Sequence, residues 1–190
     1  MAIYVKQGMS RAAQPKPVLS PPPAALLPVI PLVPSSQTAD EAWQQLAIRL
    51  AAALADLEED DFLILSPKQG SARVQFTALG KFGMRLEATS NPHLDAGEKL
   101  SREAVELMHS YGWQAPTSAM RRGVRVPVLG SPNYFMDLDV PVPFEAIARL
   151  AAANLRDIYG VAHPGDLQYA SFNMDHTRIR HPILGLKKKP

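Results

Sequence analysis

The sequence predicts an α+β fold in which helices pack on one face of an antiparallel sheet. Two short stretches, 73–78 and 84–89, alternate polar with apolar residues and are separated by only a short turn. Strands joined by so short a turn pair antiparallel, whereas a doubly wound parallel sheet requires long crossover connections. Two longer segments, 38–57 and 144–158, instead repeat apolar residues at helical spacing. If the helices cover one face, the other face of the sheet is left open.

The first expected helix starts at Thr38, because Thr38 and Glu41 form the Thr-x-x-Glu pattern of a capping box. Its apolar residues recur at 3, 4, 7, 11 and 14 positions after the first, which is helical spacing: Trp43, Leu46, Ala47, Leu50, Leu54 and Leu57. The helix is expected to end near Leu57, since the acidic run 58–61 would oppose the negative end of the helix dipole.

Strands are expected next. Residues 62–65 predict a short strand that ends at the Ser-Pro pair 66–67, and the hairpin follows with its turn at 80–83. One face of the hairpin is apolar: Val74, Phe76, Met84, Leu86 and Ala88. The other face is polar and allows opposite charges to pair across the strands: Arg73, Gln75, Arg85 and Glu87.

A second helix is expected to begin at Ser101, which is a favourable N-cap residue. The helix runs to about Tyr111, with Val105 and Met108 facing inward. Gly112 follows at the position that favours a glycine C-cap. The pattern therefore predicts a helix of about three turns.

The last expected elements are a strand, a helix and a strand. A strand over 134–138 is followed by two prolines and then by the third helix. Its apolar residues repeat the spacing of the first helix: Phe144, Ile147, Ala148, Ala151, Leu155 and Ile158. Gly160 suits the C-cap of this helix, and residues 167–172 predict the final strand.

Length and charge predict one domain with two arms. The chain has 190 residues, of which 46% are hydrophobic and 20% are charged, as in an ordinary soluble protein. Its net charge is +2, but residues 1–35 and 176–190 are basic and contain no acidic residue, so the middle is acidic. We therefore expect a proline-rich extended N-terminal arm (1–35), an α+β domain (36–174) and a basic C-terminal tail (175–190). A mildly acidic domain does not favour specific binding of nucleic acid.

The N-terminal arm is a candidate partner-binding segment. It holds eight of the eighteen prolines, which exclude a helix or a central strand and favour polyproline-like extension. Prolines also interrupt every apolar stretch that could otherwise form a transmembrane segment. The arm is nevertheless rich in aliphatic residues that we expect to dock on a partner: Leu26, Leu27, Val29, Ile30 and Leu32. The alternative is a solvated linker.

Three aromatic residues and two arginines are further candidates for partner binding. Trp113, Tyr134 and Phe135 lie next to turns, where large aromatic side chains often anchor interfaces. Core packing is the alternative for all three. Arg121 and Arg122 lie in an irregular connection and could pair with acidic groups on a partner, or be part of a solvated loop.

Catalytic and metal sites have little support. The chain contains no cysteine, which excludes disulfides, thiolate metal sites and cysteine nucleophiles, and no Gly-x-Ser-x-Gly motif is present. His176 and His181 lie five residues apart, a spacing that matches neither a helical pair of ligands nor a zinc finger, so both are expected to be solvated. The acidic run 58–61 lacks the spacing of a calcium loop and is expected to be a turn. No catalytic residue, metal or cofactor is predicted.

A series of short motifs in a fixed order carries a resemblance to a known family. The motifs are Val74-Gln75-Phe76, Arg85-Leu86-Glu87-Ala88, Ser90-Asn91, Leu100-Ser101, Tyr111-Gly112-Trp113, Pro116, Pro132-Asn133-Tyr134 and Leu155-Arg156-x-x-Tyr159-Gly160. In this order they resemble actinobacterial proteins with type III secretion chaperone-like and YbjN-like (TY-Chap) domains, over about residues 40–172. The resemblance implies an α+β domain that binds peptides or partner proteins, is not an enzyme and commonly pairs into dimers.

The functional expectation is a non-enzymatic, cytoplasmic module of this secretion chaperone/YbjN-like type that binds a protein or peptide partner. An exposed sheet face or edge would supply the binding surface, through strand addition or groove packing. A homodimer or a larger assembly is compatible with this expectation. The alternative is a structural accessory subunit of a larger complex, anchored by its proline-rich N-terminal arm. A small hydrolase or nuclease is a third hypothesis with less support.

Overall fold

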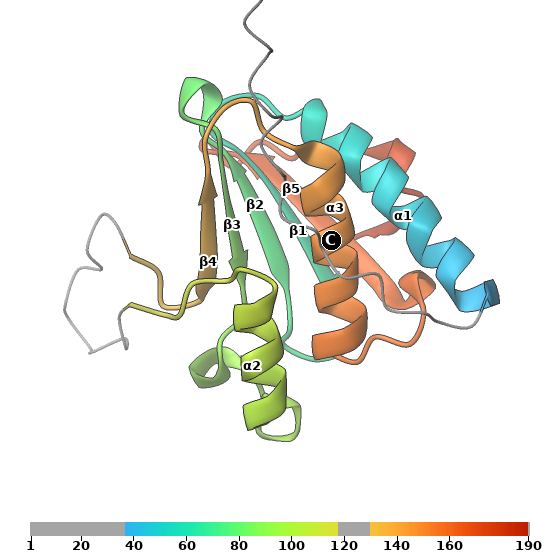
Figure 1. Cartoon of the computed structure of the whole chain (residues 1–190). Coiled ribbons are helices and arrows are strands. Elements are labelled where there is room, and N and C mark those ends of the chain that lie inside the picture. The colour runs from blue at the N-terminus through green and yellow to red at the C-terminus, as the bar shows by residue number, and fades with distance from the viewer. Residues whose placement is uncertain (1–36, 118–129, 190) are drawn as a thin grey trace, which may run out of the picture. The chain divides into compact units, whose positions relative to one another are not determined.

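The computed structural model describes residues 37–117 and 130–189, and it confirms the expected α+β fold. In this part of the chain, three α-helices accompany a six-stranded sheet (Figure 1). The elements are α1 (Gln37–Ala55), β1 (Asp61–Pro67), β2 (Val74–Ala78), β3 (Met84–Ala88), α2 (Arg102–Ser110), β4 (Tyr134–Leu138), α3 (Phe144–Ala153), β5 (Leu167–Asn173) and β6 (Lys187–Lys188). Across the sheet the strands lie in the order β4-β3-β2-β1-β5-β6.

The five expected strands form an antiparallel sheet, and an additional sixth strand makes the sheet mixed. Strands β1 to β5 pair antiparallel with their neighbours, but β6 runs parallel to β5. Residues 177–179 first run back along β5, and a 3₁₀ turn at Pro182–Leu184 precedes the short parallel strand. The last residues of the chain therefore add to the sheet.

The core lies between the sheet and a layer formed by α1 and α3, which contact each other along their length (Figure 1). The predicted apolar face of the hairpin points into this layer, and all five of its residues are buried. Successive strand residues alternate between buried and half-buried, because the opposite face of the sheet carries no helix within the described residues. The predicted one-sided packing and open face are both present.

Three element boundaries differ from those expected. Helix α1 begins at Gln37, so Thr38 is already inside it. Strand β1 continues to Pro67, which pairs with Leu167 of β5. The proline is tolerated there because its nitrogen faces the β2 side, where the pairing with β2 has already ended at Leu65. The third helix is α-helical only to Ala153 and then forms a π-helical turn.

The expected helix caps are largely confirmed. The Ser101 hydroxyl accepts a hydrogen bond from the backbone N–H of Ala104 at 3.2 Å, which satisfies one free donor at the start of α2. Gly112 follows α2 with φ at +89°, and Gly160 follows the π-helical turn with φ at +68°. Both glycines adopt the left-handed conformation that ends helices.

The C-terminal histidines were expected to be solvated, and for His181 this expectation was wrong. His176 is exposed, but the side chain of His181 is only 6% exposed. His181 lies against β5, where its backbone N–H donates to the Tyr169 hydroxyl at 3.1 Å and its Nε2 lies 3.0 Å from Ser171 Oγ. Leu184, in the turn that contacts α1, is fully buried. Burial of Leu184 and the backbone hydrogen bonds to β5 keep His181 away from solvent.

Candidate functional site

The open face of the sheet is the first candidate surface. On β1 and β5 it carries half-buried apolar side chains: Phe62, Ile64, Ala170 and Phe172. The rings of Phe62 and Phe172 stack with their centroids 5.3 Å apart. These residues are neighbours across the two strands, so they cover one another and leave only part of each ring accessible.

The remainder of this face, on β2 to β4, is mostly polar and paired within itself, although the ring of Phe135 also lies on it, beside Arg85. The Arg85 guanidinium donates two hydrogen bonds to the Asp137 carboxylate, at 2.6 and 2.8 Å, and this pairing raises the pKa of Arg85. The Gln75 side-chain amide donates to the Glu87 carboxylate at 3.3 Å. Charges pair across strands as predicted, although the partner of Arg85 lies on β4. This face therefore offers few free polar groups to a ligand.

The edges of the sheet are the second candidate, and other segments of the chain pair with both. At the β4 edge, Phe135 and Gln114 exchange two backbone hydrogen bonds, of 2.9 and 3.2 Å. At the β5 edge, Ile179 donates to Ser171 at 2.9 Å and Lys189 donates to Tyr169 at 2.7 Å. To pair with these residues, an added strand would have to displace Gln114 from β4, or Ile179 and Lys189 from β5.

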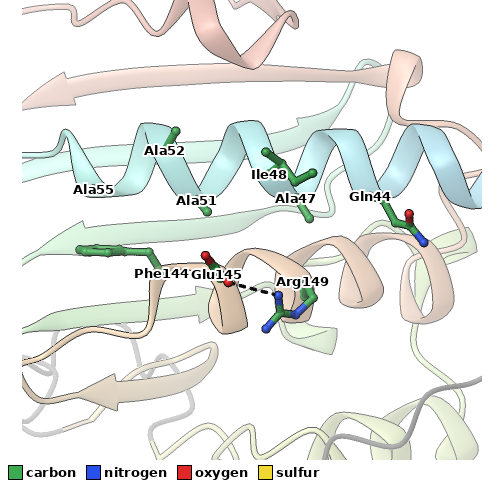
Figure 2. Close-up of a pocket in the computed structure, with 9 residues that line it drawn as sticks. All are labelled: Gln44, Ala47, Ile48, Ala51, Ala52, Ala55, Phe144, Glu145 and Arg149. Carbon is green, nitrogen blue, oxygen red and sulfur yellow. Dashed lines mark ion pairs between the residues drawn. The ribbon is translucent and has the colours of Figure 1, made fainter.

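A groove between α1 and α3 is the third candidate, and it is concave and apolar. Its volume is about 650 Å³, and its lining comes from both helices: Gln44, Ala47, Ile48, Ala51, Ala52, Ala55, Phe144, Glu145 and Arg149. In Figure 2, Ala47 and Ala51 point from α1 toward α3, with Phe144 at one end. Alanines at spacings of three and four form a stripe of small side chains, which leaves a hollow along the helix pair.

Two features of the groove favour a ligand. The side chain of Ile48 is 63% exposed although it is large and apolar. At the rim, Arg149 pairs with Glu145 at 3.7 Å, so these opposite charges largely balance each other (Figure 2). An exposed apolar residue inside a concave surface with little free charge is typical of a site for an apolar partner.

The aromatic residues expected at an interface are buried. Trp113 is 2% exposed, Tyr134 is 5% exposed and Phe135 is 3% exposed, as their core-packing alternative predicts. A role in partner binding stays a prediction for these three. The other predicted binding residues lie outside the described part of the chain: Leu26, Leu27, Val29, Ile30, Leu32, Arg121 and Arg122.

The groove was not predicted from the sequence, although the sequence contains one signal of it. Ile48 follows Ala47 but lies off the apolar stripe that packs α1 on the core. A large aliphatic residue on the polar side of an amphipathic helix indicates a surface that can bind a partner. The groove itself depends on how closely α1 and α3 approach, which periodicity does not reveal.

One buried serine and histidine pair resembles a catalytic dyad, but its hydrogen bonds oppose that role. Ser171 Oγ lies 3.0 Å from His181 Nε2 and donates its proton to the carbonyl oxygen of Phe62 at 2.7 Å. The histidine must therefore donate to the serine, whereas a nucleophilic serine donates to its base. Burial also lowers the pKa of His181. The pair anchors the C-terminal segment to β5.

The described residues contain neither a candidate metal cluster nor a membrane-spanning helix. No group of three or more histidine, aspartate or glutamate residues in this part of the chain could hold a metal ion. None of its helices is long and apolar enough to cross a membrane. Among the candidate surfaces described above, the α1–α3 groove is the one that is both concave and apolar.

Comparison with known proteins agrees with the fold. No curated protein and no solved structure matches the chain. A family model, described as "T3SS (YopN, CesT) and YbjN peptide-binding chaperone 3", matches residues 36–173, which extend from the residue before α1 to the last residue of β5. The resemblance seen in the sequence motifs is thereby confirmed. The chain belongs to this family of peptide-binding chaperones.

Proposed function

We propose that the chain is a non-enzymatic, chaperone-like module that binds an apolar segment of a partner protein in the α1–α3 groove. The observation that carries the proposal is the groove itself, with Ile48 exposed above a floor of alanines. The family supplies the class of ligand, since its members are described as peptide-binding chaperones. The polar part of the open sheet face and the paired positions at the sheet edges are less favourable, because their polar groups already have partners within the chain. The apolar part of the open face is partly covered by the stacked rings of Phe62 and Phe172 themselves.

The dimensions of the groove favour a short amphipathic helix as ligand. Its α1 side extends from Gln44 to Ala55, which corresponds to about 16 Å, or three helical turns. A helix of that length, placed beside α1 and α3, would present apolar side chains at positions i, i+4 and i+7. The Glu145–Arg149 pair at the rim leaves little net charge, so apolar anchors are expected to decide the affinity.

A selected peptide tests this proposal. A phage-displayed library of peptides about 12 residues long would supply a binder, whose affinity is then measured by calorimetry for wild type and variants. Ile48→Asp is expected to raise the dissociation constant at least about tenfold, which corresponds to about 1.4 kcal/mol. Enrichment of peptides with helically spaced apolar residues is expected in the same selection.

Ile183→Asp is the matched control, because Ile183 is also an exposed isoleucine, at 45%, and lies in the C-terminal segment. It is expected to change the dissociation constant less than about twofold. Equal losses for the two variants, or no loss for Ile48→Asp, would contradict binding in the groove.

The other expectations about function extend this proposal. A cytoplasmic location and the absence of catalysis suit a peptide-binding chaperone, and a homodimer is compatible with it. The accessory-subunit alternative depends on residues 1–35, which lie outside the described residues, so it stays a prediction.

A further inference from the structure

A second hollow lies on the other flank of α1. It has a volume of about 300 Å³ and lies between α1, the turn before β5 and the C-terminal turn. From these three segments come Arg49, His163 with Gly165, and Gly185 with Leu186. The C-terminal turn lies beyond residues 36–173, so this hollow extends past the domain that the family model covers.

Arg49 is the central charged group of this hollow. Its Nε is buried and has no hydrogen-bond partner, and no carboxylate in the described part of the chain pairs with it. A Cβ placed on Gly185 would lie 3.8 Å from the guanidinium carbon, so the guanidinium packs against the C-terminal turn. A half-buried guanidinium is stabilised by an anion, because burial without a partner leaves its donors unsatisfied.

The groups around Arg49 also favour an anion. The Nδ1 atom of His163 accepts a hydrogen bond from the N–H of Gly165 at 2.9 Å, so in the neutral ring the proton is on Nε2, which is a donor. The side-chain amide of Gln45 adds further donors. Lys68 lies beside the hollow and donates to the Gly165 carbonyl at 2.6 Å. No acidic residue lines the hollow.

We propose that this hollow binds the C-terminal carboxylate of a peptide. The planar guanidinium of Arg49 can hold a carboxylate through two parallel hydrogen bonds, and Gln45 or His163 can donate to it as well. Leu186 supplies apolar surface for the side chain of the last residue. The inference rests on the proposed peptide-binding function but uses a site separate from the α1–α3 groove.

The test compares two tripeptides, acetyl-Gly-Ala-Leu with a free carboxylate and the same peptide with a terminal amide. Each is added at millimolar concentration to the ¹⁵N-labelled full-length chain while the NMR signals are followed. The free acid is expected to shift the side-chain Nε–H signal of Arg49 and the backbone signals of Gly165 and Gly185, with an affinity at least about tenfold above that of the amide. Equal shifts from acid and amide would overturn the proposal.

Variants separate the site from general charge effects. Arg49→Met keeps the aliphatic stem and is expected to lose the response to the acid, and Arg49→Lys is expected to weaken it severalfold because the planar fork is lost. Arg102→Met, at an exposed arginine on α2 outside both hollows, is the matched control and is expected to retain the response. The same loss in Arg49→Met and Arg102→Met would contradict a specific site.

Two further additions identify the source of the carboxylate and keep the two proposals distinguishable. If acetyl-leucine binds as tightly as the tripeptide acid, the ligand is a small acid and the proposal of a peptide ligand is wrong. If inorganic phosphate binds more tightly than either, the proposal of a carboxylate ligand is wrong. Ile48→Asp is expected to leave the response to the tripeptide acid intact. If this response persists while the groove fails to bind any selected peptide, the proposed groove function is wrong and the carboxylate site stands.

Discussion

The two flanks of α1 present different chemistry although they belong to one helix. Toward α3, Ala47, Ile48 and Ala51 line an apolar groove whose rim charges pair with each other. Toward the C-terminal turn, Gln45 and Arg49 line a smaller hollow, and the buried Nε of Arg49 has no hydrogen-bond partner. Consecutive residues of a helix point about 100° apart, so Ile48 and Arg49 can serve separate surfaces.

The difference shows what each neighbour of α1 contributes. Helix α3 brings small and apolar side chains, so its contact with α1 leaves an apolar hollow. The C-terminal segment brings a turn with a left-handed glycine and a flanking leucine, and it leaves Arg49 without an acidic partner. One helix with a single buried stripe can thus support two binding surfaces. The following predictions test this separation, beginning with the largest expected effect.

Leu184→Ala is expected to lower the free energy of unfolding by about 3 kcal/mol, because it removes a fully buried side chain and leaves a cavity. Ile183→Ala, at a residue that is 45% exposed, is expected to cost less than about 0.5 kcal/mol. Urea unfolding measures both values. A similar, small loss for both variants would show that the C-terminal segment is not anchored as described. The hollow at Arg49 would then lack the side that the C-terminal turn forms.

Arg156→Met is expected to lower the free energy of unfolding by about 1 kcal/mol, because the Arg156 guanidinium pairs with Asp40 of α1 at 3.1 Å and with Asp157 at 2.6 Å. These partners raise the pKa of Arg156. Arg49→Met is expected to change the free energy of unfolding by less than about 0.5 kcal/mol, since no ion pair is lost. A loss in Arg49→Met as large as that in Arg156→Met would mean that Arg49 is a structural residue.

Lower pH is expected to loosen the C-terminal segment before the α1–α3 contact. Burial lowers the pKa of His181 below its ordinary 6.5, so the unfolded state binds the proton more readily and acid destabilises the docked segment. The stabilisation is complete above pH 6.5 and declines as the pH falls toward the lower pKa of the folded state.

Hydrogen exchange of the Ile179 and Lys189 amides checks this expectation, since both donate to β5. Their protection factors, which correct for the intrinsic pH dependence of exchange, are expected to fall severalfold in acid while those of α3 stay constant. A His181→Gln variant is expected to lack this selective fall. A uniform loss of protection would assign the pH dependence to the whole domain.

Ile48→Ser is expected to have the smallest effect on stability, less than about 0.5 kcal/mol, because the side chain is already 63% exposed. Thermal unfolding would report this difference. A loss of about 2 kcal/mol would instead show that Ile48 packs on the fold and is not available to a partner.

The hairpin and the core could be predicted from sequence because their signals are local. Alternation in β2 and β3 identifies which residues point inward, and helical spacing identifies the buried stripes of α1 and α3. The short strand β6 could not be predicted, since two lysines carry no strand pattern and tertiary contacts of His181 and Leu184 position it.

The candidate sites were harder to predict than the fold. The aromatic residues Trp113, Tyr134 and Phe135 are conspicuous in sequence, yet all three are buried, Trp113 and Tyr134 in the core and Phe135 on the opposite face of the sheet. The groove depends on the approach of two helices, and the hollow at Arg49 depends on a turn more than 130 residues further along the chain. The position of Ile48 off the buried stripe of α1 is the local signal of the groove that the sequence contains.

The most direct test of peptide binding in the α1–α3 groove is to locate a selected peptide on the folded chain. The peptide carries a nitroxide spin label at one end, and the broadening of backbone NMR signals is measured in the full-length protein. If the peptide binds in the groove, signals from α1 residues 47–55 and from the start of α3 are expected to broaden first. Those of four residues on the open sheet face are expected not to broaden: Phe62, Ile64, Ala170 and Phe172. Broadening centred on these four residues would contradict binding in the α1–α3 groove.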